Sequence, residues 1–513
     1  MPVNQQGTHS REEIMELLDG LEVAAISTAA GDRLRTRMMH YGVDKDFNFY
    51  LASMKGDPKT LQITHHPSVS ILAFKQEENI NDSREVEVIG KAVMVRDDAE
   101  RQRALEATAR KSPVVKYMME TGNQGLLDCI KVVPETVKFR VFREIVQGMP
   151  PTVMEFPQHR VVVNDWSLLN LKLRNWVTEV RVPFLSASVV PILLGSAIAG
   201  MASGTFHWGF FLLTLLGGVL LQAGTNVMND YADHRSGNDD INQEFVRPFS
   251  GGSRIIQLGL LSPLEVLSGA LLFFTLGSLI GLYLVWARGW PVLALGVVGV
   301  ASGFFYSLKP VDWGSRGVGE TAVGLNFGIL MALGAYYVQT LSFSWVPVVA
   351  ALPVSLLIAA VLYINEFPDY HADKAVGKNT LVVRLGRHRA VVGYLALMAT
   401  TYISIIVGVA WGILPWFTLL ALVTLPLAVK GVLNARKHYA SSYDLIPANA
   451  ATILVHLAVG LILTLAFLWE AFQVQGLLYV AVAGTVFLLY VLYEYRHIEQ
   501  QKNAFLGLKR SVG

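Results

Sequence analysis

Two short acidic stretches combine residue types and a spacing that can hold a metal and a diphosphate. They are residues 229–240 (NDYADHRSGNDD) and residues 365–378 (NEFPDYHADKAVGK). In both, Asn and Asp recur four residues apart, and on a helix this spacing places the side chains on one face. Carboxylate and amide oxygens are ligands that suit Mg²⁺, which commonly bridges protein carboxylates to phosphate. We therefore predict a magnesium site with the candidate ligands Asn229, Asp230, Asp233, Asp239, Asp369 and Asp373.

Each acidic stretch follows directly on a long apolar segment, which argues against ordinary solvated loop acids. A charged side chain drawn to the middle of a membrane costs about 2.5–3.5 kcal/mol, so two matched clusters at such positions indicate a function. Basic residues near them are expected to hold the diphosphate, although any one alone would more often be a loop anchor. The candidates for diphosphate binding are Arg247, Lys309, Arg316 and Lys378. The candidate catalytic residues are Asp233, Asp369, Asp373 and Lys309.

The chain from about residue 176 to 495 is predicted to be an all-α bundle of membrane helices. Soluble chains carry about 25% charged residues, whereas this chain of 513 residues is 52% hydrophobic and 16% charged. A helix needs about 20 apolar residues to span a bilayer. Apolar segments near that length lie at 182–201, 208–228, 263–286, 290–307, 321–340, 346–364, 390–411, 414–430, 450–470 and 475–494.

Lysine and arginine gather in alternate loops between these segments, and the other loops hold only Arg288. Basic loops remain on the cytoplasmic side of a membrane. With ten spans, this rule predicts a multi-pass protein of the cell membrane whose N- and C-termini are both cytoplasmic.

The first 146 residues have an ordinary soluble composition and are predicted to form a separate domain. Ser10 and Glu13 have the spacing of a helix-capping pair, and Asp57-Pro58-Lys59 is typical of a helix start. Alternating apolar and polar residues predict strands at Glu22–Thr28, Phe47–Ser53, Glu85–Arg96 and Val137–Arg143. The fold class is therefore a small, mostly antiparallel barrel with a few helices. Residues 147–175 are expected to be a linker and an interfacial helix, and residues 496–513 a basic cytoplasmic tail.

Composition also excludes several classes of site. The net charge of +2 and the lack of a basic stripe give no sign of nucleic-acid binding. The single cysteine, Cys129, excludes an intramolecular disulfide framework and a zinc site built from cysteines.

The membrane region resembles the UbiA-type prenyltransferases over about residues 175–470. The resemblance lies in the ND-x-x-D and D-x-x-x-D stretches and the Tyr-x-x-Lys between them. Three further segments are similar to the branch that prenylates 1,4-dihydroxy-2-naphthoate, namely RGVGE (316–320), GAYYVQT (334–340) and GKNTLVVRLG (377–386). It implies Mg²⁺-dependent transfer of a polyprenyl group from polyprenyl diphosphate to an aromatic acceptor, in menaquinone or related quinone biosynthesis. Aromatic faces can steady the carbocation left behind, and the candidates are Tyr231, Tyr306, Phe327, Tyr336 and Tyr363.

The sequence departs from the family pattern at Gly237, where the first motif usually ends in Asp. Either Asp239 or Asp240 can substitute for that ligand, and the sequence does not decide between them. Ten segments also exceed the nine spans usual in the family, so the tenth is an addition.

The first domain resembles the FMN-binding split barrels of the pyridoxamine-phosphate-oxidase type, from LEVAAIST through RTRMMHYGVDKDFNFYLASMKGDPKTLQITHHPSVSILAF to EVEVIGKAVMVRD. The resemblance implies a split β-barrel and FMN as a second cofactor, unless it has been lost. It also implies that the flavin phosphate is held by Arg35 or Arg37, Ser53 and Lys59. Members of that fold often form homodimers. A flavin module fused to a quinone-forming enzyme suggests a role in the redox state of the acceptor or product.

Two alternatives stay open at this point. One is a UbiA-type enzyme with another acceptor, such as a glycerol-phosphate lipid or a haem or chlorophyll precursor. The other is a flavin-binding redox sensor on a degenerate membrane anchor, which is disfavoured because both acidic motifs are largely intact.

Overall fold

A computed structural model describes residues 4–30, 33–156, 165–242, 244–246, 249–308 and 310–472. The chain divides into two compact units. The first is Met1–Trp176 together with Ile255–Ser262, and the second is Val177–Arg254 together with Pro263–Gly513. Each unit is considered by itself.

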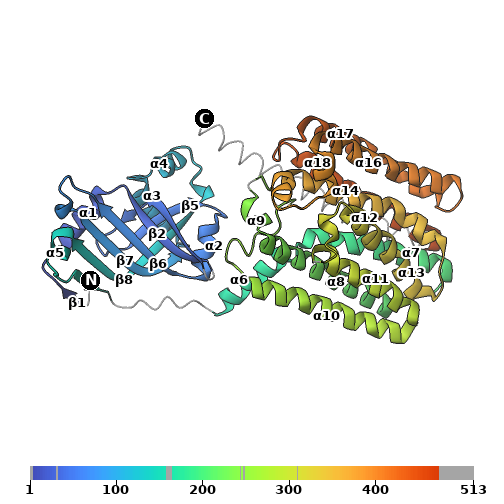
Figure 1. Cartoon of the computed structure of the whole chain (residues 1–513), viewed down its shortest axis with the longest axis horizontal. Coiled ribbons are helices and arrows are strands. Elements are labelled where there is room, and N and C mark those ends of the chain that lie inside the picture. The colour runs from blue at the N-terminus through green and yellow to red at the C-terminus, as the bar shows by residue number, and fades with distance from the viewer. Residues whose placement is uncertain are drawn as a thin grey trace. The chain divides into compact units, whose positions relative to one another are not determined.

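The first unit is built on one antiparallel sheet in the order β1-β9-β8-β7-β6-β2-β3, with β5 pairing to β8 and β4 to β5 (Figure 1). Its strands are β1 Asn4–Gln6, β2 Val23–Ala30, β3 Arg33–His40, β4 Gly42–Val43, β5 Phe49–Met54, β6 Ser68–Lys75, β7 Arg84–Met94, β8 Leu127–Val141 and β9 Thr152–Glu155. A bulge between Ile89 and Gly90 bends β7 against β8, and a Cβ at Gly90 would lie 2.3 Å from the Val133 carbonyl oxygen. The sheet forms a half-barrel, so the predicted antiparallel barrel is confirmed.

Five helices accompany this sheet, and two of them, α1 and α2, begin where the capping residues predicted. The helices are α1 Arg11–Gly20, α2 Pro58–His65, α3 Asp98–Ala109, α4 Pro113–Glu120 and α5 Phe142–Val146. Ser10 Oγ accepts a hydrogen bond from the Glu13 amide at 3.2 Å, and Asp57 Oδ1 accepts one from the Lys59 amide at 3.0 Å. A buried cluster that includes Phe47, Phe49 and Phe139 forms the core.

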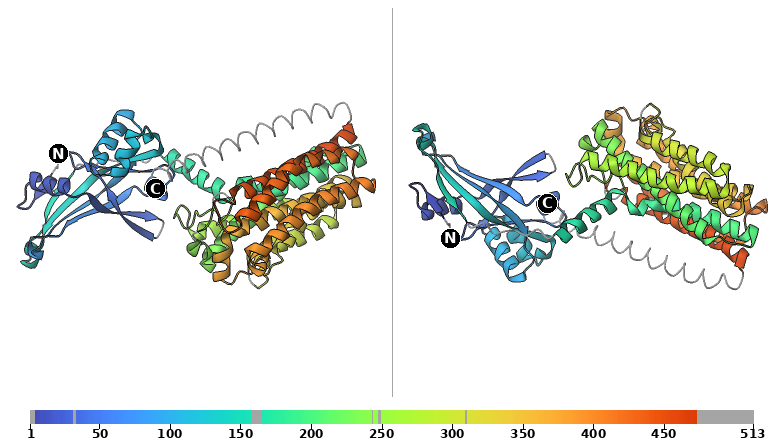
Figure 2. Two further views of the ribbon diagram at one scale, coloured as in Figure 1. Left: turned by 90° about the horizontal axis from the view of Figure 1, so that it is seen from above. Right: turned by 90° about the horizontal axis from the view of Figure 1, so that it is seen from below.

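Long helices make up the second unit, and they run in roughly a common direction in both views of Figure 2. They follow α6 Asp165–Glu179, which crosses from the first unit into the second, and are α7 Ser186–Ser203, α8 Trp208–Ser236, α9 Asn238–Ile241, α10 Pro263–Arg288, α11 Trp290–Ser307, α12 Gly319–Val323, α13 Met331–Thr340, α14 Trp345–Ala375, α15 Leu381–Leu385, α16 Arg387–Ala410, α17 Leu425–His438 and α18 Ile446–Phe472. A π-helical segment, Gly324–Leu330, joins α12 to α13, and a 3₁₀ segment, Trp416–Thr424, precedes α17.

Nine helices in the described part of the chain are long and apolar enough to cross a membrane. They match the first nine predicted segments, with α12, the π-helical segment and α13 forming one span and Trp416–His438 another. The predicted bundle of nine to ten spans is thus confirmed for these nine. The tenth segment, 475–494, lies outside the described residues.

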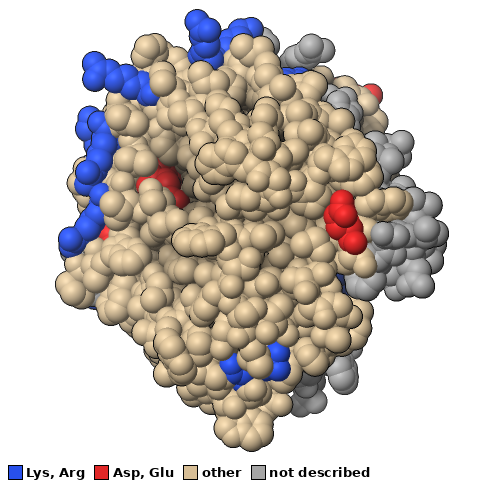
Figure 3. All heavy atoms as spheres, turned by 90° about the vertical axis from the view of Figure 1, so that its right-hand side faces the viewer, with Lys and Arg blue, Asp and Glu red and all other residues tan. Residues whose placement is uncertain are grey.

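Exposed tryptophans mark the ends of the helices opposite to the acidic stretches. They are Trp208, Trp286, Trp290, Trp345, Trp411 and Trp416, each more than 60% exposed. Tryptophan concentrates at membrane–water interfaces, so this belt marks one membrane surface. Figure 3 shows a face of the molecule on which uncharged side chains dominate, with most of its Lys and Arg gathered towards one edge.

Candidate active site

The two acidic stretches meet at the ends of α8, α9 and α14. Asn238 Nδ2 donates to Asp373 Oδ1 at 2.9 Å, and Asn242 Nδ2 donates to Asp369 Oδ1 at 2.7 Å. The Gly251 amide also donates to Asp369 Oδ2, at 3.4 Å. Side chains that are far apart in sequence therefore form one polar cluster.

Lys378 cross-links the same cluster. Its Nζ donates to Asp233 Oδ1 at 3.0 Å and lies 3.8 Å from Asp373 Oδ1. Burial lowers the pKa of Lys378, but Asp233 and Asp373 outweigh burial and hold that pKa well above its ordinary value. Lys378 is therefore a fixed positive charge between the two motifs.

Gly237 turns the first acidic stretch inward. It adopts φ +76°, ends α8 and begins α9, and positive φ is a conformation in which glycine carries no steric penalty. The turn leaves Asp239 3% exposed while Asp240 faces solvent. Of the two candidate substitutes for the missing motif aspartate, the structure directs Asp239 into the cluster.

Arg254 holds the Asp239 loop in place. Its guanidinium donates to the carbonyl oxygens of Asp239 and Asn242, lies 3.7 Å from Asp239 Oδ1 and stacks over the Phe245 ring at 3.9 Å. Burial raises the pKa of Asp239 to about 7, the charge of Asp233 adds to that effect, and Arg254 opposes it. Arg254 is thus a scaffold for the first acidic stretch as well as a charge.

Asp230 is occupied by protein donors. It is 2% exposed, its Oδ1 accepts a hydrogen bond from Arg181, and its Oδ2 accepts one from the Ser253 amide at 3.0 Å. The Ser253 hydroxyl donates to Glu179, the last residue of α6, and burial raises the pKa of Glu179 to about 7. These contacts give Asp230 a positioning role between α6, α8 and the 250–254 loop, while its role as a metal ligand remains a prediction.

Replacing Gly252 should disturb this arrangement more than replacing Gly237. Both glycines have positive φ, so each Ala variant should lose about 1–2 kcal/mol to backbone strain. A Cβ at Gly252 would also lie 2.8 Å from Asp230 Oδ1, whereas one at Gly237 meets nothing within 4 Å. We expect Gly252→Ala to lower the Tm in detergent more than Gly237→Ala does. Equal shifts would contradict the packing role of Gly252.

The cluster has the chemistry of a Mg²⁺ site without a prebuilt ligand cage. Four carboxylates, Asp233, Asp239, Asp369 and Asp373, face the described cations Lys378 and Arg254, which leaves negative charge in excess. Among the described residues no three Asp, Glu, His or Cys side chains are arranged to hold a metal ion by themselves. Mg²⁺ typically uses one or two carboxylates plus water and substrate phosphate, so these residues fit it when a diphosphate supplies the other oxygens.

The other predicted site residues divide into three cases. Asn229 lies beside the cluster, where its Nδ2 donates to Ser307 Oγ at 3.1 Å. Arg316 is exposed and donates to the Pro310 carbonyl at 2.6 Å, so the structure does not bring it to the carboxylates. Arg247 and Lys309 lie outside the described residues.

A buried carboxyl pair next to the cluster was missed by the sequence analysis. Glu366 and Glu320 are 7% and 3% exposed, and the two carboxyl groups are electrostatic neighbours. Glu320 Oε1 accepts a hydrogen bond from the Leu381 amide at 2.9 Å. Glu366 lies inside the second acidic stretch, but no pattern in the sequence indicates that Glu320 would face it.

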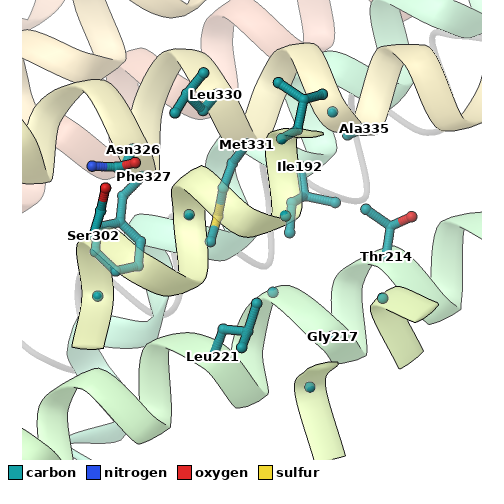
Figure 4. Close-up of a pocket in the computed structure, with 18 of the residues that line it drawn as sticks. Ile192, Thr214, Gly217, Leu221, Ser302, Asn326, Phe327, Leu330, Met331 and Ala335 are labelled. Atoms are coloured by element: carbon teal, nitrogen blue, oxygen red, sulfur yellow. The ribbon is translucent and has the colours of Figure 1, made fainter. Parts of the chain in front are cut away.

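An apolar pocket begins beside the acidic cluster and runs between α8, α10, α11, the π-helical segment and α13 (Figure 4). Its walls are mainly apolar with a few polar groups, as is typical of small-molecule sites. Tyr306 lines it and is an electrostatic neighbour of Lys378, which connects the pocket to the cluster. Of the five predicted aromatic residues, Tyr306 and Phe327 line the pocket, and Phe274 joins them.

The residues predicted to hold a flavin phosphate gather in part at the start of α2. Lys59 Nζ donates to Ser53 Oγ at 3.0 Å and to Asp57 Oδ2 at 2.8 Å. Arg37 Nη2 donates to Gln62 on the same helix at 2.8 Å. Arg35 is exposed and is not brought to this group by any of the described hydrogen bonds.

The comparisons with known proteins agree with both parts of the structure. Residues 188–446 match the model of the UbiA prenyltransferase family. The chain belongs to this family. The prenyltransferase also matches, over residues 10–122, the family described as pyridoxamine 5'-phosphate oxidase. Both resemblances seen in the sequence, and the enzyme class, are confirmed.

Relatives of this UbiA-family enzyme carry specific names. A 1,4-dihydroxy-2-naphthoate octaprenyltransferase of Haemophilus influenzae is 31% identical, over 51% of this chain and 86% of that protein. A 2-carboxy-1,4-naphthoquinone phytyltransferase of Synechocystis is 28% identical, over 57% of this chain and 93% of that protein. The solved General Stress Protein 26 from Bacillus anthracis is 21% identical over 26% of this chain and 94% of that chain, with a TM-score of 0.22.

Proposed function

We propose that this enzyme transfers a polyprenyl group from polyprenyl diphosphate to an aromatic acceptor of the 1,4-dihydroxy-2-naphthoate type, in Mg²⁺-dependent menaquinone or related quinone biosynthesis. The observation that carries the proposal is the single cluster formed by Asp233, Asp369 and Asp373 next to an apolar pocket. Such a site has carboxylates for a metal-bound diphosphate and apolar walls for an isoprenoid chain. The names of the Haemophilus influenzae and Synechocystis relatives support a naphthoate-type acceptor.

The charges of the site suit departure of diphosphate. Bound Mg²⁺ supplies Lewis-acid neutralisation of the developing anion, and its expected ligands are Asn229, Asp233, Asp239, Asp369 and Asp373. Lys378 adds a fixed positive charge between the two motifs, and Lys309 and Arg247 remain proposed diphosphate contacts. Fixed charges in a water-poor site stabilise developing charge strongly.

The pocket suits the allylic carbocation that is left when the bond between the isoprenoid carbon and the diphosphate oxygen breaks. This cation must be kept from water. The apolar walls formed by α8, α10 and α11 surround it with side chains that do not bind water. The aromatic faces of Phe274, Tyr306 and Phe327 can steady a cation. An electron-rich ring carbon of the acceptor then forms the new bond at the allylic carbon, and that ring carbon loses its proton, or its carboxyl group as CO₂, to restore the aromatic ring.

The test uses the full chain in membranes with labelled polyprenyl diphosphates and a panel of aromatic acceptors. We expect a prenylated naphthalene product, loss of transfer when EDTA removes divalent cations, and recovery when Mg²⁺ is restored. Full transfer after chelation would contradict the metal requirement. Product formed only from a glycerol-phosphate lipid or a tetrapyrrole would support the alternative acceptor class instead.

We also propose that both termini are cytoplasmic in a multi-pass cell-membrane protein. Lys and Arg gather in the loops on the side of the acidic motifs, which supports an orientation with the cluster at the cytoplasmic surface. Cysteines placed near Gly7 and near Ser342 test this when intact cells are treated with a membrane-impermeant reagent. Only the cysteine near Ser342 should react, and labelling of both would refute the proposal. The domain limits 1–146, 147–175, 176–495 and 496–513 remain our proposal.

Of the two candidate arginines, the structure brings Arg37 to the group at α2, and we propose that the first domain binds FMN through Arg37, Ser53 and Lys59. A lysine at a helix N-terminus is a sound anion site, and Lys59 lies at the start of α2. Burial lowers the pKa of Arg37 and the nearby Asp57 opposes this, so the two groups share one neighbourhood. Such a domain would handle the redox state of the acceptor or product.

Lys59→Ala should weaken FMN binding at least about 10-fold, as expected when a charge-assisted contact of roughly 1.5–3 kcal/mol is lost. Quenching of flavin fluorescence measures this affinity, and Lys55→Ala, an exposed neighbour, is the matched control. Purified protein without flavin absorbance, whose Tm does not respond to added FMN, would refute the cofactor proposal.

A homodimer through the first domain is also proposed. Large apolar side chains are exposed on three strands of its sheet, β3, β6 and β7, namely Leu34, Met38, Leu72, Phe74 and Ile89. Met38 and Leu72 both pair with Ala25 of β2, so their side chains lie on the same face of the sheet. A monomeric mass by light scattering in detergent would refute this.

A further inference from the structure

Asn326 brings an amide side chain to the wall of an otherwise apolar pocket. It lines that pocket together with Ser302 and Phe327, and Figure 4 draws these three on one side and Thr214 on the other. Asn326 Nδ2 donates to the Ala322 carbonyl at 2.7 Å, one turn back along the helix. Its Oδ1 is buried and has no hydrogen-bond partner among the described residues. A buried acceptor without a donor is unfavourable, so packing alone does not explain this residue.

The backbone at Asn326 is irregular and firmly held. The residue lies in the π-helical segment Gly324–Leu330, and single π-turns inside α-helices often occur at functional sites. Ser355 of α14 donates its hydroxyl to the Gly324 carbonyl at 2.7 Å. A Cβ at Gly328 would lie 2.5 Å from Ser355 Cβ, so the helices touch closely there. The segment is thereby fixed in the position that brings Asn326 to the pocket.

Several polar residues of the pocket, Thr225, Ser302 and Asn326 among them, lie at the end nearest the acidic cluster, and Thr214 lies at the other. Thr225 lines the pocket four residues before Asn229 on α8, a distance of about 6 Å along the helix axis. Ser302 lines it five residues before Ser307, the partner of Asn229, which is about 7.5 Å. Thr214 lies eleven residues before Thr225, or about 16 Å away. An acceptor ring that meets the allylic carbon beside the diphosphate therefore belongs at this polar end.

We propose that the Asn326 carboxamide, which lines the pocket, turns when the aromatic acceptor binds, so that its Oδ1 accepts a hydrogen bond from a hydroxyl group of the acceptor; this makes Asn326 a specificity-determining residue. This inference rests on the proposed function and assigns the acceptor subsite within it. A site built to hydrogen-bond a substrate hydroxyl strongly rejects the analogue that lacks it, because the buried protein group is then left unpaired. The remainder of the pocket, towards Thr214, is left for the isoprenoid chain.

The test measures kcat/KM of the full chain in membranes for 1,4-dihydroxy-2-naphthoate and for its 1- and 4-methyl ethers, with Mg²⁺ and one polyprenyl diphosphate. The wild type should prefer the dihydroxy acceptor over at least one ether by about 10-fold or more. In Asn326→Leu that preference should fall towards one and the acceptor KM should rise about 10-fold. The KM for the polyprenyl diphosphate should stay within about twofold.

Matched variants separate this role from a structural one. Asn434 also has a buried Oδ1 without a hydrogen-bond partner in the described structure, but it lies on α17 away from the pocket. Asn434→Leu should keep the acceptor preference. Asn326→Thr should retain part of it, because a threonine hydroxyl can donate to the carbonyl four residues back and still accept a bond. If Asn326→Leu fails to insert in the membrane, Asn326→Ala takes its place.

An unchanged preference in the Asn326 variants, or an equal loss in Asn434→Leu, would overturn the inference alone. A wild type that prenylates the ethers as well as the dihydroxy acceptor would also overturn it. Absence of transfer to every aromatic acceptor by the wild type would instead overturn the proposed function, and this inference with it.

Discussion

Asp233→Ala and Asp369→Ala should each lower prenyl transfer by at least about 10²-fold while the protein still inserts in the membrane. The two residues come from α8 and α14, yet both belong to one cluster bridged by Lys378, Asn238, Asn242 and Asp373. Loss of either carboxylate removes charge stabilisation at the leaving diphosphate, and the removal of even one such group typically costs 10²–10³ in rate. Turnover of labelled polyprenyl diphosphate in membranes measures the effect.

Asp240→Ala is the matched control for this prediction. It removes a carboxylate from the same stretch, but Asp240 faces solvent whereas Asp239 is buried. We expect near-normal transfer in the control, with equal amounts of all three variants in the membrane fraction. Near-normal turnover in both Asp233→Ala and Asp369→Ala would remove the site assignment.

Arg254→Ala should produce the second large effect, a loss of both stability and transfer. Arg254 is 8% exposed and pairs with Asp239, which is 3% exposed. Removing one partner of a buried ion pair costs about 3–5 kcal/mol, because the other charge is left uncompensated. Two carbonyl oxygens of the loop, at Asp239 and Asn242, lose their donor as well. We expect a clear drop in Tm and at least a 10²-fold loss of transfer.

Arg254→Lys distinguishes the scaffold role from a pure charge effect. Lysine keeps the charge but lacks the planar fork that donates to two carbonyl groups, so this variant should be intermediate in both Tm and transfer. Arg235→Ala, an exposed arginine at the end of α8, is the control. If the Tm and the prenyl transfer of Arg254→Lys equalled those of the wild type, only the charge of Arg254 would matter.

Much of the fold could be predicted because its signals are local. Ser10 and Asp57 cap helices where their side chains suggest it, and long apolar runs give the nine described spans. The acidic motifs were found because four-residue spacing is visible in sequence. Asn238 and Asn242 are themselves four residues apart and could have been found by the same argument, since their partners Asp373 and Asp369 are also four residues apart.

The rest of the site depends on contacts between distant segments. Nothing local indicates that Arg181 and Glu179, before the first span, reach Asp230 and Ser253. The choice between Asp239 and Asp240 rests on the turn at Gly237, whose direction needs three-dimensional packing. The π-helical turn at Asn326 follows from the fit of Gly324 and Gly328 against Ser355, which no periodicity reveals.

The central claim is that one metal-bound diphosphate is held by carboxylates from both motifs. Mn²⁺ accepts the same oxygen ligands as Mg²⁺, so electron–nuclear double resonance of the Mn²⁺-loaded chain with polyprenyl diphosphate measures metal–³¹P coupling directly. The account predicts a coupling in the wild type that is lost or strongly weakened in both Asp233→Ala and Asp369→Ala. A wild type without coupling, or a coupling that persists unchanged in both variants, would contradict it.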